Sequence, residues 1–247
     1  MALSDAGQLL LLWDIDGTLL QRASVEHGQA VRHALAEVHG IKDVDAPYVQ
    51  IAGRTDGAIA RDLLLAAGVP EADIDAGASD VRAAACRAYE NLCPPDLSHT
   101  VAPGIATLLA ELADAPEHFR LSLLTGNFEG VARLKLERAG IGDFFPRGQG
   151  AFGSDAEARE ALPAVARERA GEFNGGSPWP RERTLIIGDT PRDVLAARAD
   201  KLRCIAVATG PFDAAALREA DFVAQDGHEI ASVLRKLSSS PAPDAGQ

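Results

Sequence analysis

Residues 9–20 read LLLLWDIDGTLL, an apolar run that stops at two acidic side chains, Asp14 and Asp16, and then turns at Gly17. A short apolar run bounded by turn residues predicts a buried β-strand. Open parallel sheets gather their active sites outside the carboxyl ends of the strands, so two acids there favour a bound cation. A calcium loop does not fit, because it needs glycine at its sixth position and a carboxylate at its twelfth, which is Val25 here. For this stretch taken alone, a solvated Asp-Gly turn is the alternative.

Composition and charge argue against several classes of function. The chain has 247 residues, of which 47% are hydrophobic, so we expect one large α/β domain or a core with an inserted subdomain. Its 24 basic and 36 acidic residues give a net charge of −12, which disfavours nucleic acid or a membrane as a partner. Three cysteines at spacings that match no zinc or redox motif indicate a reducing compartment. No apolar stretch is long enough to span a bilayer, and we expect a cytoplasmic monomer or homodimer.

A core interrupted by a helical insertion is the predicted organisation. Between residues 21 and 98 the apolar residues recur at helical spacing without strand-like alternation, which predicts inserted helices. Residues 1–20 and 99–238 then form the core, and the polar residues 239–247 are predicted to be disordered. The helices predicted in the insertion are Val25–His39, Thr55–Ala67 and Glu71–Leu92.

Strands and helices alternate in the second part of the core. This alternation predicts right-handed crossovers and a parallel sheet to which the first strand also belongs, and hence an α/β fold. The predicted strands are Arg120–Leu124, Arg183–Ile187, Arg203–Ala208 and Phe222–Ala224, and the predicted helices are Ile105–Ala113, Phe128–Ala139, Asp155–Ala170, Pro191–Ala199 and Glu229–Leu237.

Polar residues follow three of the predicted strands. Besides the two acids, Thr125-Gly126-Asn127 follows the second strand, and Asp189 precedes a helix that begins at Pro191. Alone, Thr125 or Asp189 is explained as a helix cap. Together, Asp14 and Asp189 suit Mg²⁺, which prefers one or two protein carboxylates plus phosphate oxygens. The set therefore predicts a phosphate ligand, with hydrogen-bond donors from residues 125–127 and the helix that follows them.

Three segments resemble motifs of the haloacid dehalogenase-like hydrolase superfamily. They are Asp14 to Leu19 for the first motif, Leu124 to Asn127 for the second and Ile187 to Asp193 for the fourth. The match covers residues 9–235, and the insertion resembles the α-helical cap of phosphoglycolate phosphatase and β-phosphoglucomutase relatives. The resemblance implies a Rossmann-like parallel-sheet core with an inserted α-helical cap that acts as a mobile lid.

The resemblance also implies roles for individual residues. Asp14 would be the nucleophile that becomes an aspartyl-phosphate, and Asp16 the general acid/base whose main-chain carbonyl also binds the metal. Asp189 would be a further ligand of Mg²⁺, with Thr190 and Asp193 supporting the metal site from behind. The phosphate-binding residues would be Thr125, Gly126 and Asn127.

The third motif of this superfamily usually offers a lysine, and here the chain departs from the pattern. No lysine lies between Lys135 and Lys201, so the candidate is Arg159, which can bind phosphate through its planar fork. A solvated helix residue is the alternative for Arg159. Lys201 stands where relatives generally have a glycine, and we expect a left-handed backbone there.

Within the predicted cap, Arg54 stands where related caps recognise substrate. Direct substrate contact is one interpretation, and an ion pair with Asp56 or another acidic neighbour is the other. Thr55, which follows Arg54, is explained as a helix N-cap.

The chain is interpreted as a Mg²⁺-dependent phosphatase of a small phosphorylated metabolite. Phosphorus rather than halogen chemistry follows from Asp16, which dehalogenases of this superfamily typically lack. A phosphomutase of the same superfamily is one alternative, and a non-catalytic phosphate-binding or signalling protein on the same scaffold is another. A silent relative would be expected to lose Asp14, Asp16 or Asp189, and this chain has all three.

Overall fold

A single parallel sheet organises the chain. The computed structural model describes residues 7–42, 51–172 and 175–239. Its sheet has the strand order β2-β1-β3-β4-β5, and every pairing is parallel, which confirms the predicted α/β class. The strands are β1 (Leu9–Trp13), β2 (Phe119–Leu123), β3 (Thr184–Gly188), β4 (Arg203–Val207) and β5 (Phe222–Ala224).

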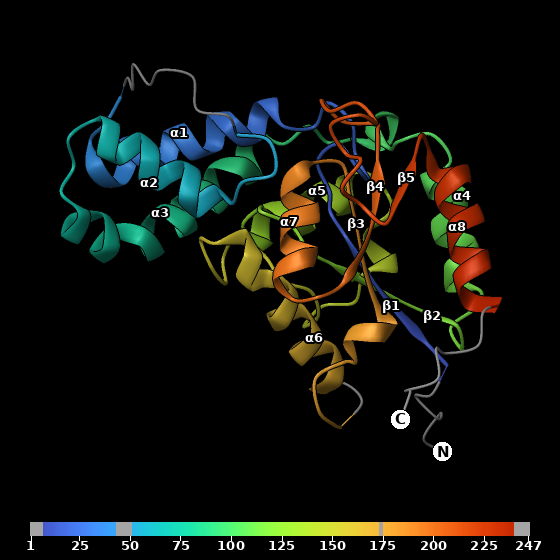
Figure 1. Ribbon diagram of the computed structural model, residues 1–247. Helices are drawn as coiled ribbons and strands as arrows, with labels where there is room; N and C mark the ends of the chain where they lie inside the picture. Colours follow the sequence, from blue (N-terminus) through green and yellow to red (C-terminus); the bar gives the residue numbers. More distant parts are fainter. Residues whose placement is uncertain (1–6, 43–50, 173–174, 240–247) are drawn as a thin grey trace.

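Helices cover both faces of the sheet, and a separate group of three lies to one side (Figure 1). The separate group consists of α1, α2 and α3, which fall within the segment predicted as an insertion. On the sheet, α4 and α8 lie on one side while α6 and α7 lie on the other (Figure 1). The helices are α1 (Val25–His39), α2 (Asp56–Ala66), α3 (Glu71–Leu92), α4 (Ile105–Ala113), α5 (Glu129–Arg138), α6 (Leu162–Glu172), α7 (Pro191–Ala199) and α8 (Gly227–Ser239).

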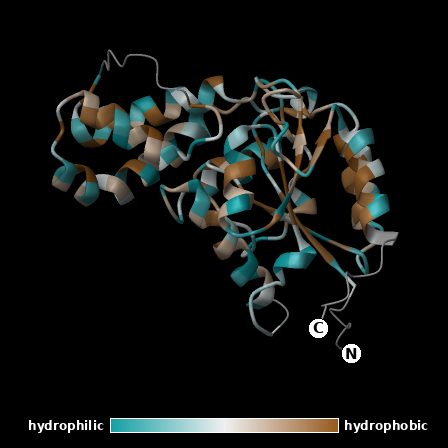
Figure 2. Cartoon of the chain, in the orientation of Figure 1, coloured by the Kyte–Doolittle hydropathy of each residue, from teal (hydrophilic) through white to brown (hydrophobic). Residues whose placement is uncertain are grey.

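Strand β1 is buried on both faces, as a strand inside a covered parallel sheet must be. Leu9, Leu11 and Trp13 pack into the apolar cluster that contains α4 and α8 residues. Leu10 and Leu12 point the other way, into the cluster that contains α6 and α7 residues. The hydrophobic colour along the strands in Figure 2 follows from this double coverage. The unbroken run of leucines in β1 is thus explained by a strand that is covered on both faces of the sheet, and not by a buried helix.

The helices α1, α2 and α3 share an apolar core of their own. It is built from residues such as Leu35, Leu64 and Val81, all buried. Phe128 and Val131, at the start of α5, belong to the same cluster. The helical group is therefore anchored on α5, the helix that follows the second motif.

One predicted helix begins seven residues too early. The sequence pattern indicated Asp155–Ala170, whereas the structure has a short 3₁₀ turn at Arg159–Ala161 and then α6, which begins at Leu162. Pro163 explains the difference, because a proline ring clashes with the carbonyl four residues earlier, here Arg159, and so belongs in a first turn. Arg159 consequently lies in the approach to the helix.

The other predicted strand and helix bounds differ from the observed ones by no more than two residues. Thr55 is the N-cap of α2, as predicted, and accepts a hydrogen bond from the backbone of Ala58 at 3.2 Å. Lys201 has a φ of 57°, the left-handed backbone expected there. Helix α8 runs to Ser239, and the rest of the tail predicted to be disordered, residues 240–247, lies outside the described residues.

Candidate active site

The sheet order brings the three polar motifs together. Strand β1 pairs with β2 on one side and with β3 on the other, all parallel, so the loops after these strands leave the same edge as neighbours. Asp14 follows β1, Thr125 and Asn127 follow β2, and Asp189 follows β3. All four side chains are buried. Crossovers that place β1 between β2 and β3 thus assemble the site from distant segments.

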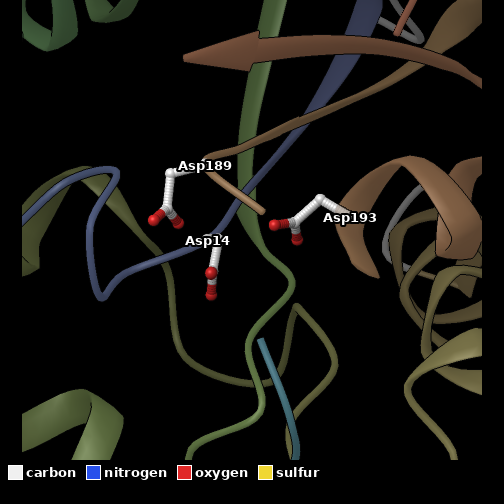
Figure 3. A group of neighbouring side chains, drawn as sticks. All are labelled: Asp14, Asp189 and Asp193. Carbon is white, nitrogen blue, oxygen red and sulfur yellow. The ribbon is translucent and has the colours of Figure 1, made fainter. Parts of the chain in front are cut away.

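Three buried carboxylates converge at this edge. Asp14, Asp189 and Asp193 each offer an oxygen, and these oxygens lie within 4.8 Å of one another. Figure 3 shows the three side chains, with Asp14 after the end of β1 and with Asp189 and Asp193 on the stretch that leads from β3 into α7. Such a cluster of hard oxygen ligands is the kind that Mg²⁺ binds.

Asp189 is held in place with one oxygen left over. Its Oδ1 accepts a hydrogen bond from the Thr18 hydroxyl at 3.2 Å, whereas its Oδ2 has no hydrogen-bond partner among the described residues. A Cβ at Gly17 would lie 2.1 Å from that Oδ2, and one at Gly210 would lie 1.7 Å from it. The two glycines therefore let the backbone enclose the carboxylate closely. A buried oxygen without a donor fits a metal ligand.

Burial and mutual repulsion disfavour the charged forms of these acids. Burial, together with the nearby charges of Asp14 and Asp193, raises the pKa of Asp189 to about 8. Burial also raises the pKa of Asp14 to about 6, although the Arg159 guanidinium opposes the rise. A divalent cation would reverse both shifts, because it stabilises the carboxylate forms.

Arg159 supplies positive charge next to Asp14. Its side chain is only 4% exposed and pairs with Asp14 at 3.1 Å, and it also pairs with Asp193. The alternative of a solvated helix residue is therefore wrong. The guanidinium lines the same cavity as Asp14 and Asp189.

Asp193 braces the loop that carries Asp189. Its Oδ2 accepts hydrogen bonds from the Thr190 backbone at 3.0 Å and the Thr190 hydroxyl at 2.7 Å, while Oδ1 accepts one from Arg159. Thr190 and Asp193 thus form a capping box at the start of α7. Because protein donors already occupy both of its oxygens, Asp193 fits a supporting place behind the metal ligands.

Asp16 has a different environment from Asp14, two residues away. Lys135 donates to both of its carboxylate oxygens at 2.7 Å, and the Asn127 amide donates at 2.9 Å. Burial alone would raise the pKa of Asp16, but the charge of Lys135 and the hydrogen bonds from Lys135 and Asn127 outweigh it and hold the pKa below its ordinary value. Asp16 is therefore a carboxylate in this state.

Sequence reasoning missed Lys135. In α5 it is completely buried, and it lies on the same apolar stripe as Val131, Leu136 and Ala139. A lysine on an apolar stripe is a signal, because lysine is almost never fully buried unless it is paired. Its partner, however, is set by how α5 packs and not by spacing in the chain.

The second motif serves both the site and the helical group above it. Asn127 reaches Asp16, and the Thr125 hydroxyl accepts a hydrogen bond from the Asn127 backbone at 3.3 Å. The Gly126 carbonyl accepts a hydrogen bond from the Asp56 backbone at 2.8 Å. A Cβ at Gly126 would lie 2.1 Å from the Arg54 carbonyl, so only glycine permits this close approach.

Arg54 is engaged in an ion pair. It donates to Asp62 at 2.6 Å and to the Ala58 carbonyl at 3.2 Å. The ion-pair interpretation therefore describes its contacts, with Asp62 as the acidic neighbour and not Asp56. Arg54 still lines the cavity.

A cavity of about 700 Å³ lies between the helical group and the sheet edge. Asp14, Asp16 and Asp189 line it from the sheet side, Arg32 lines it from α1, and Arg22 lines it from the segment that leads into α1. Neither arginine has an ion-pair partner among the residues that the structure describes. The cavity thus joins three acids at the sheet edge to two arginines that have no ion-pair partner among the described residues.

Comparisons with known proteins agree with this arrangement. A family model described as a haloacid dehalogenase-like hydrolase matches residues 9–199. Phosphoglycolate phosphatase of Rhodospirillum rubrum is 27% identical over 201 residues, covering 81% of this chain and 79% of that protein.

Solved structures share the fold at low sequence identity. A β-phosphoglucomutase from Clostridium difficile matches with a TM-score of 0.64 and 14% identity, covering 93% of this chain and 98% of that one. CbbY from Rhodobacter sphaeroides, in complex with phosphate, matches with a TM-score of 0.62 and 20% identity, covering 90% and 96%. In the part of the chain that the structure describes, no helix has the length and apolar character needed to cross a membrane.

The raised pKa values predict how metal-free stability depends on pH. The folded protein binds protons at Asp14 and Asp189 more tightly than the unfolded chain does, so these groups make stability fall as pH rises from about 4 to about 8. We expect thermal unfolding in a chelator to shift to lower temperature over this range, and Mg²⁺ to restore stability mainly at the alkaline end. The variant Asp189→Asn should flatten the dependence. An unchanged pH profile in that variant would contradict the account.

Proposed function

The chain belongs to the haloacid dehalogenase-like hydrolases, and we propose that it is a Mg²⁺-dependent phosphatase that works through a phosphorylated Asp14. It is a phosphatase-type member of this family, and hence a phosphoric monoester hydrolase. One observation carries the proposal: buried Asp14 pairs with the Arg159 guanidinium at 3.1 Å and offers an oxygen within 4.8 Å of one from Asp189, whose Oδ2 has no hydrogen-bond partner among the described residues. A nucleophile, a phosphate-binding cation and an open ligand position therefore share one space.

Asp14 is suited to attack phosphorus. In the first step its carboxylate oxygen forms a bond to phosphorus while the bond from phosphorus to the leaving oxygen breaks, which yields an aspartyl-phosphate and an alcohol. Arg159, Thr125 and Asn127 bind and orient the phosphoryl oxygens. A Mg²⁺ ion held by Asp14, Asp189 and the main-chain carbonyl of Asp16 would neutralise the charge on the phosphoryl group.

Asp16 is suited to move the proton in both steps. Its carboxylate form can accept the proton of the water that hydrolyses the aspartyl-phosphate. To protonate the leaving oxygen in the first step, it must itself be protonated, although Lys135 favours its charged form. A phosphate dianion arriving beside Asp16 raises the pKa of that carboxyl, because like charges disfavour ionisation.

Two arginines in the cavity wall favour a substrate that carries a second anionic group besides its phosphate. Arg22 and Arg32 line the cavity, and neither is neutralised by a described partner. Arg22 also has a φ of 59°, a left-handed backbone that is strained for arginine. Such strain is typical of functional positions. A small carboxylate-bearing phosphomonoester such as phosphoglycolate fits this charge pattern, and the name of the Rhodospirillum rubrum relative agrees with it.

Phosphate release is the direct test of the proposed chemistry. We expect Mg²⁺-dependent release from small phosphomonoesters, lost by at least about a thousandfold in Asp14→Asn because the nucleophile is gone. Asp114→Asn, an exposed change at the end of α4, is the matched control and should retain activity. Turnover that survives in Asp14→Asn would contradict the mechanism. Release of no phosphate from any ester by the folded wild type would favour a mutase or a binding role.

A pair of substrates that differ in one group tests whether Arg22 and Arg32 bind a carboxylate. Phosphoglycolate and 2-hydroxyethyl phosphate differ by a carboxylate in place of a hydroxymethyl group. We expect Arg32→Met and Arg22→Met to raise KM for phosphoglycolate about tenfold, a loss of about 1.4 kcal/mol, with little change for 2-hydroxyethyl phosphate. Arg87→Met, which removes an exposed cap arginine paired with Glu37, is the control. Equal effects on both substrates would refute a carboxylate-binding role.

A further inference from the structure

Lys135 uses every proton of its ammonium group in buried contacts. It donates to Oδ1 and Oδ2 of Asp16, each at 2.7 Å, and lies 3.1 Å from Nδ1 of His27. A lysine ammonium has three N–H donors and no acceptor, so these three contacts satisfy it completely. The side chain does not line the cavity, whereas Asp16 and His27 do. Lys135 therefore contacts Asp16 from behind.

The contacts continue through His27 to Asp56. Because Lys135 can only donate, Nδ1 of His27 accepts, and the ring proton lies on Nε2, which is 2.9 Å from Oδ2 of Asp56. The same Asp56 oxygen accepts a hydrogen bond from the Phe128 backbone at 2.7 Å, at the N-terminus of α5. That helix end favours a negative charge. The ring of His27 also packs edge-on against the ring of Tyr89, with the two ring centroids 5.9 Å apart.

The network spans the two parts of the molecule. His27 lies on α1 and Asp56 on α2, both in the helical group, whereas Lys135 lies on α5 beside the sheet. Asp56 is also tied to the second motif through its backbone hydrogen bond to Gly126. The orientation of the Lys135 ammonium is thus set by residues from both parts.

Stability alone does not account for the network. Burying charged groups costs solvation energy, and a buried ion pair is often no more stabilising than well-packed apolar side chains of the same volume. The network instead ends on the carboxylate that must transfer protons. It holds both oxygens of Asp16 while leaving that residue on the wall of the cavity.

We propose that Lys135 is a positioning residue for Asp16, oriented by His27 and Asp56, and that this support is required for proton transfer to the leaving group. The inference rests on the proposed phosphatase function. It assigns Lys135 no contact with substrate, so its effect must pass through Asp16.

Leaving-group dependence separates this role from a general effect on folding. An alkyl phosphate such as 2-hydroxyethyl phosphate needs a proton on its leaving oxygen, whereas p-nitrophenyl phosphate does not. The parameter kcat/KM reports the steps up to departure of the leaving group. General acid catalysis is worth roughly 10²- to 10⁴-fold, so we expect Lys135→Met to lower kcat/KM for the alkyl ester at least about tenfold more than for the aryl ester.

A matched variant on the same helix supplies the control. Arg133 is also a buried cation of α5, but its guanidinium binds the carbonyls of Phe145, Pro146 and Gln149 instead of the site. Arg133→Met should therefore change kcat/KM for both esters by the same factor. Asp56→Asn, which weakens the hydrogen bond that orients His27, should lower kcat/KM more for the alkyl ester than for the aryl ester, as Lys135→Met does. If Lys135→Met does not fold, this second variant tests the inference in its place.

A double variant tests whether Lys135 acts through Asp16. In an Asp16→Asn background, Lys135→Met should cause little further loss of kcat/KM for the alkyl ester, because the effects of substitutions at interacting residues are not additive. An equal loss for both esters in Lys135→Met, or full additivity with Asp16→Asn, would overturn the inference while leaving the phosphatase function intact. Failure of the wild type to hydrolyse either ester would contradict the proposed function, and the role of Lys135 with it.

Discussion

Unbalanced negative charge at the end of β1 is the constraint on which the site depends. Asp14, Asp189 and Asp193 place ligand oxygens within 4.8 Å of one another in a buried space. Two like charges 4 Å apart repel by about 4 kcal/mol at the effective dielectric of a partly polar protein region. Arg159 offsets part of this repulsion at Asp14 and Asp193. The open oxygen of Asp189 then marks where a divalent cation would complete the balance.

The two acids of the first motif show how environment divides chemistry between neighbours. Asp14 lies among acids, and burial raises its pKa to about 6. A divalent cation would lower that pKa again and so favour the carboxylate that the proposed nucleophile requires. Asp16 lies against Lys135, which overcomes the cost of burial and lowers the pKa of its carboxyl. Asp14 and Asp16, two residues apart, thus lie in environments that shift their pKa values in opposite directions. The proposed mechanism requires the reverse order, with Asp14 ionised and Asp16 protonated when the leaving group departs. A cation bound at Asp14 and a phosphate dianion beside Asp16 would shift the two pKa values in those directions.

Much of the site was predictable, because strand ends and turn residues are local patterns. The positions of Asp14, Thr125 and Asp189 at one sheet edge follow from parallel strands and short turns. Lys201 in a left-handed turn was equally local.

Contacts between distant segments were not predictable in the same way. The pattern around Arg159 indicated a helix that Pro163 prevents, and the Asp62 partner of Arg54 lies two helical turns further along the chain. The pairing of Lys135 with Asp16 depends on how α5 packs against the loop after β1. Pairings of this kind arise from tertiary packing, which residue spacing alone does not encode.

Trapping the phosphorylated enzyme tests whether Asp14 is the nucleophile. The enzyme would be mixed with a radiolabelled phosphomonoester and Mg²⁺, quenched in acid within milliseconds and cleaved into peptides. We expect transient label on the peptide that contains Asp14, with the base lability of an acyl phosphate. Label on any other residue, or phosphate release without label on the protein, would contradict it.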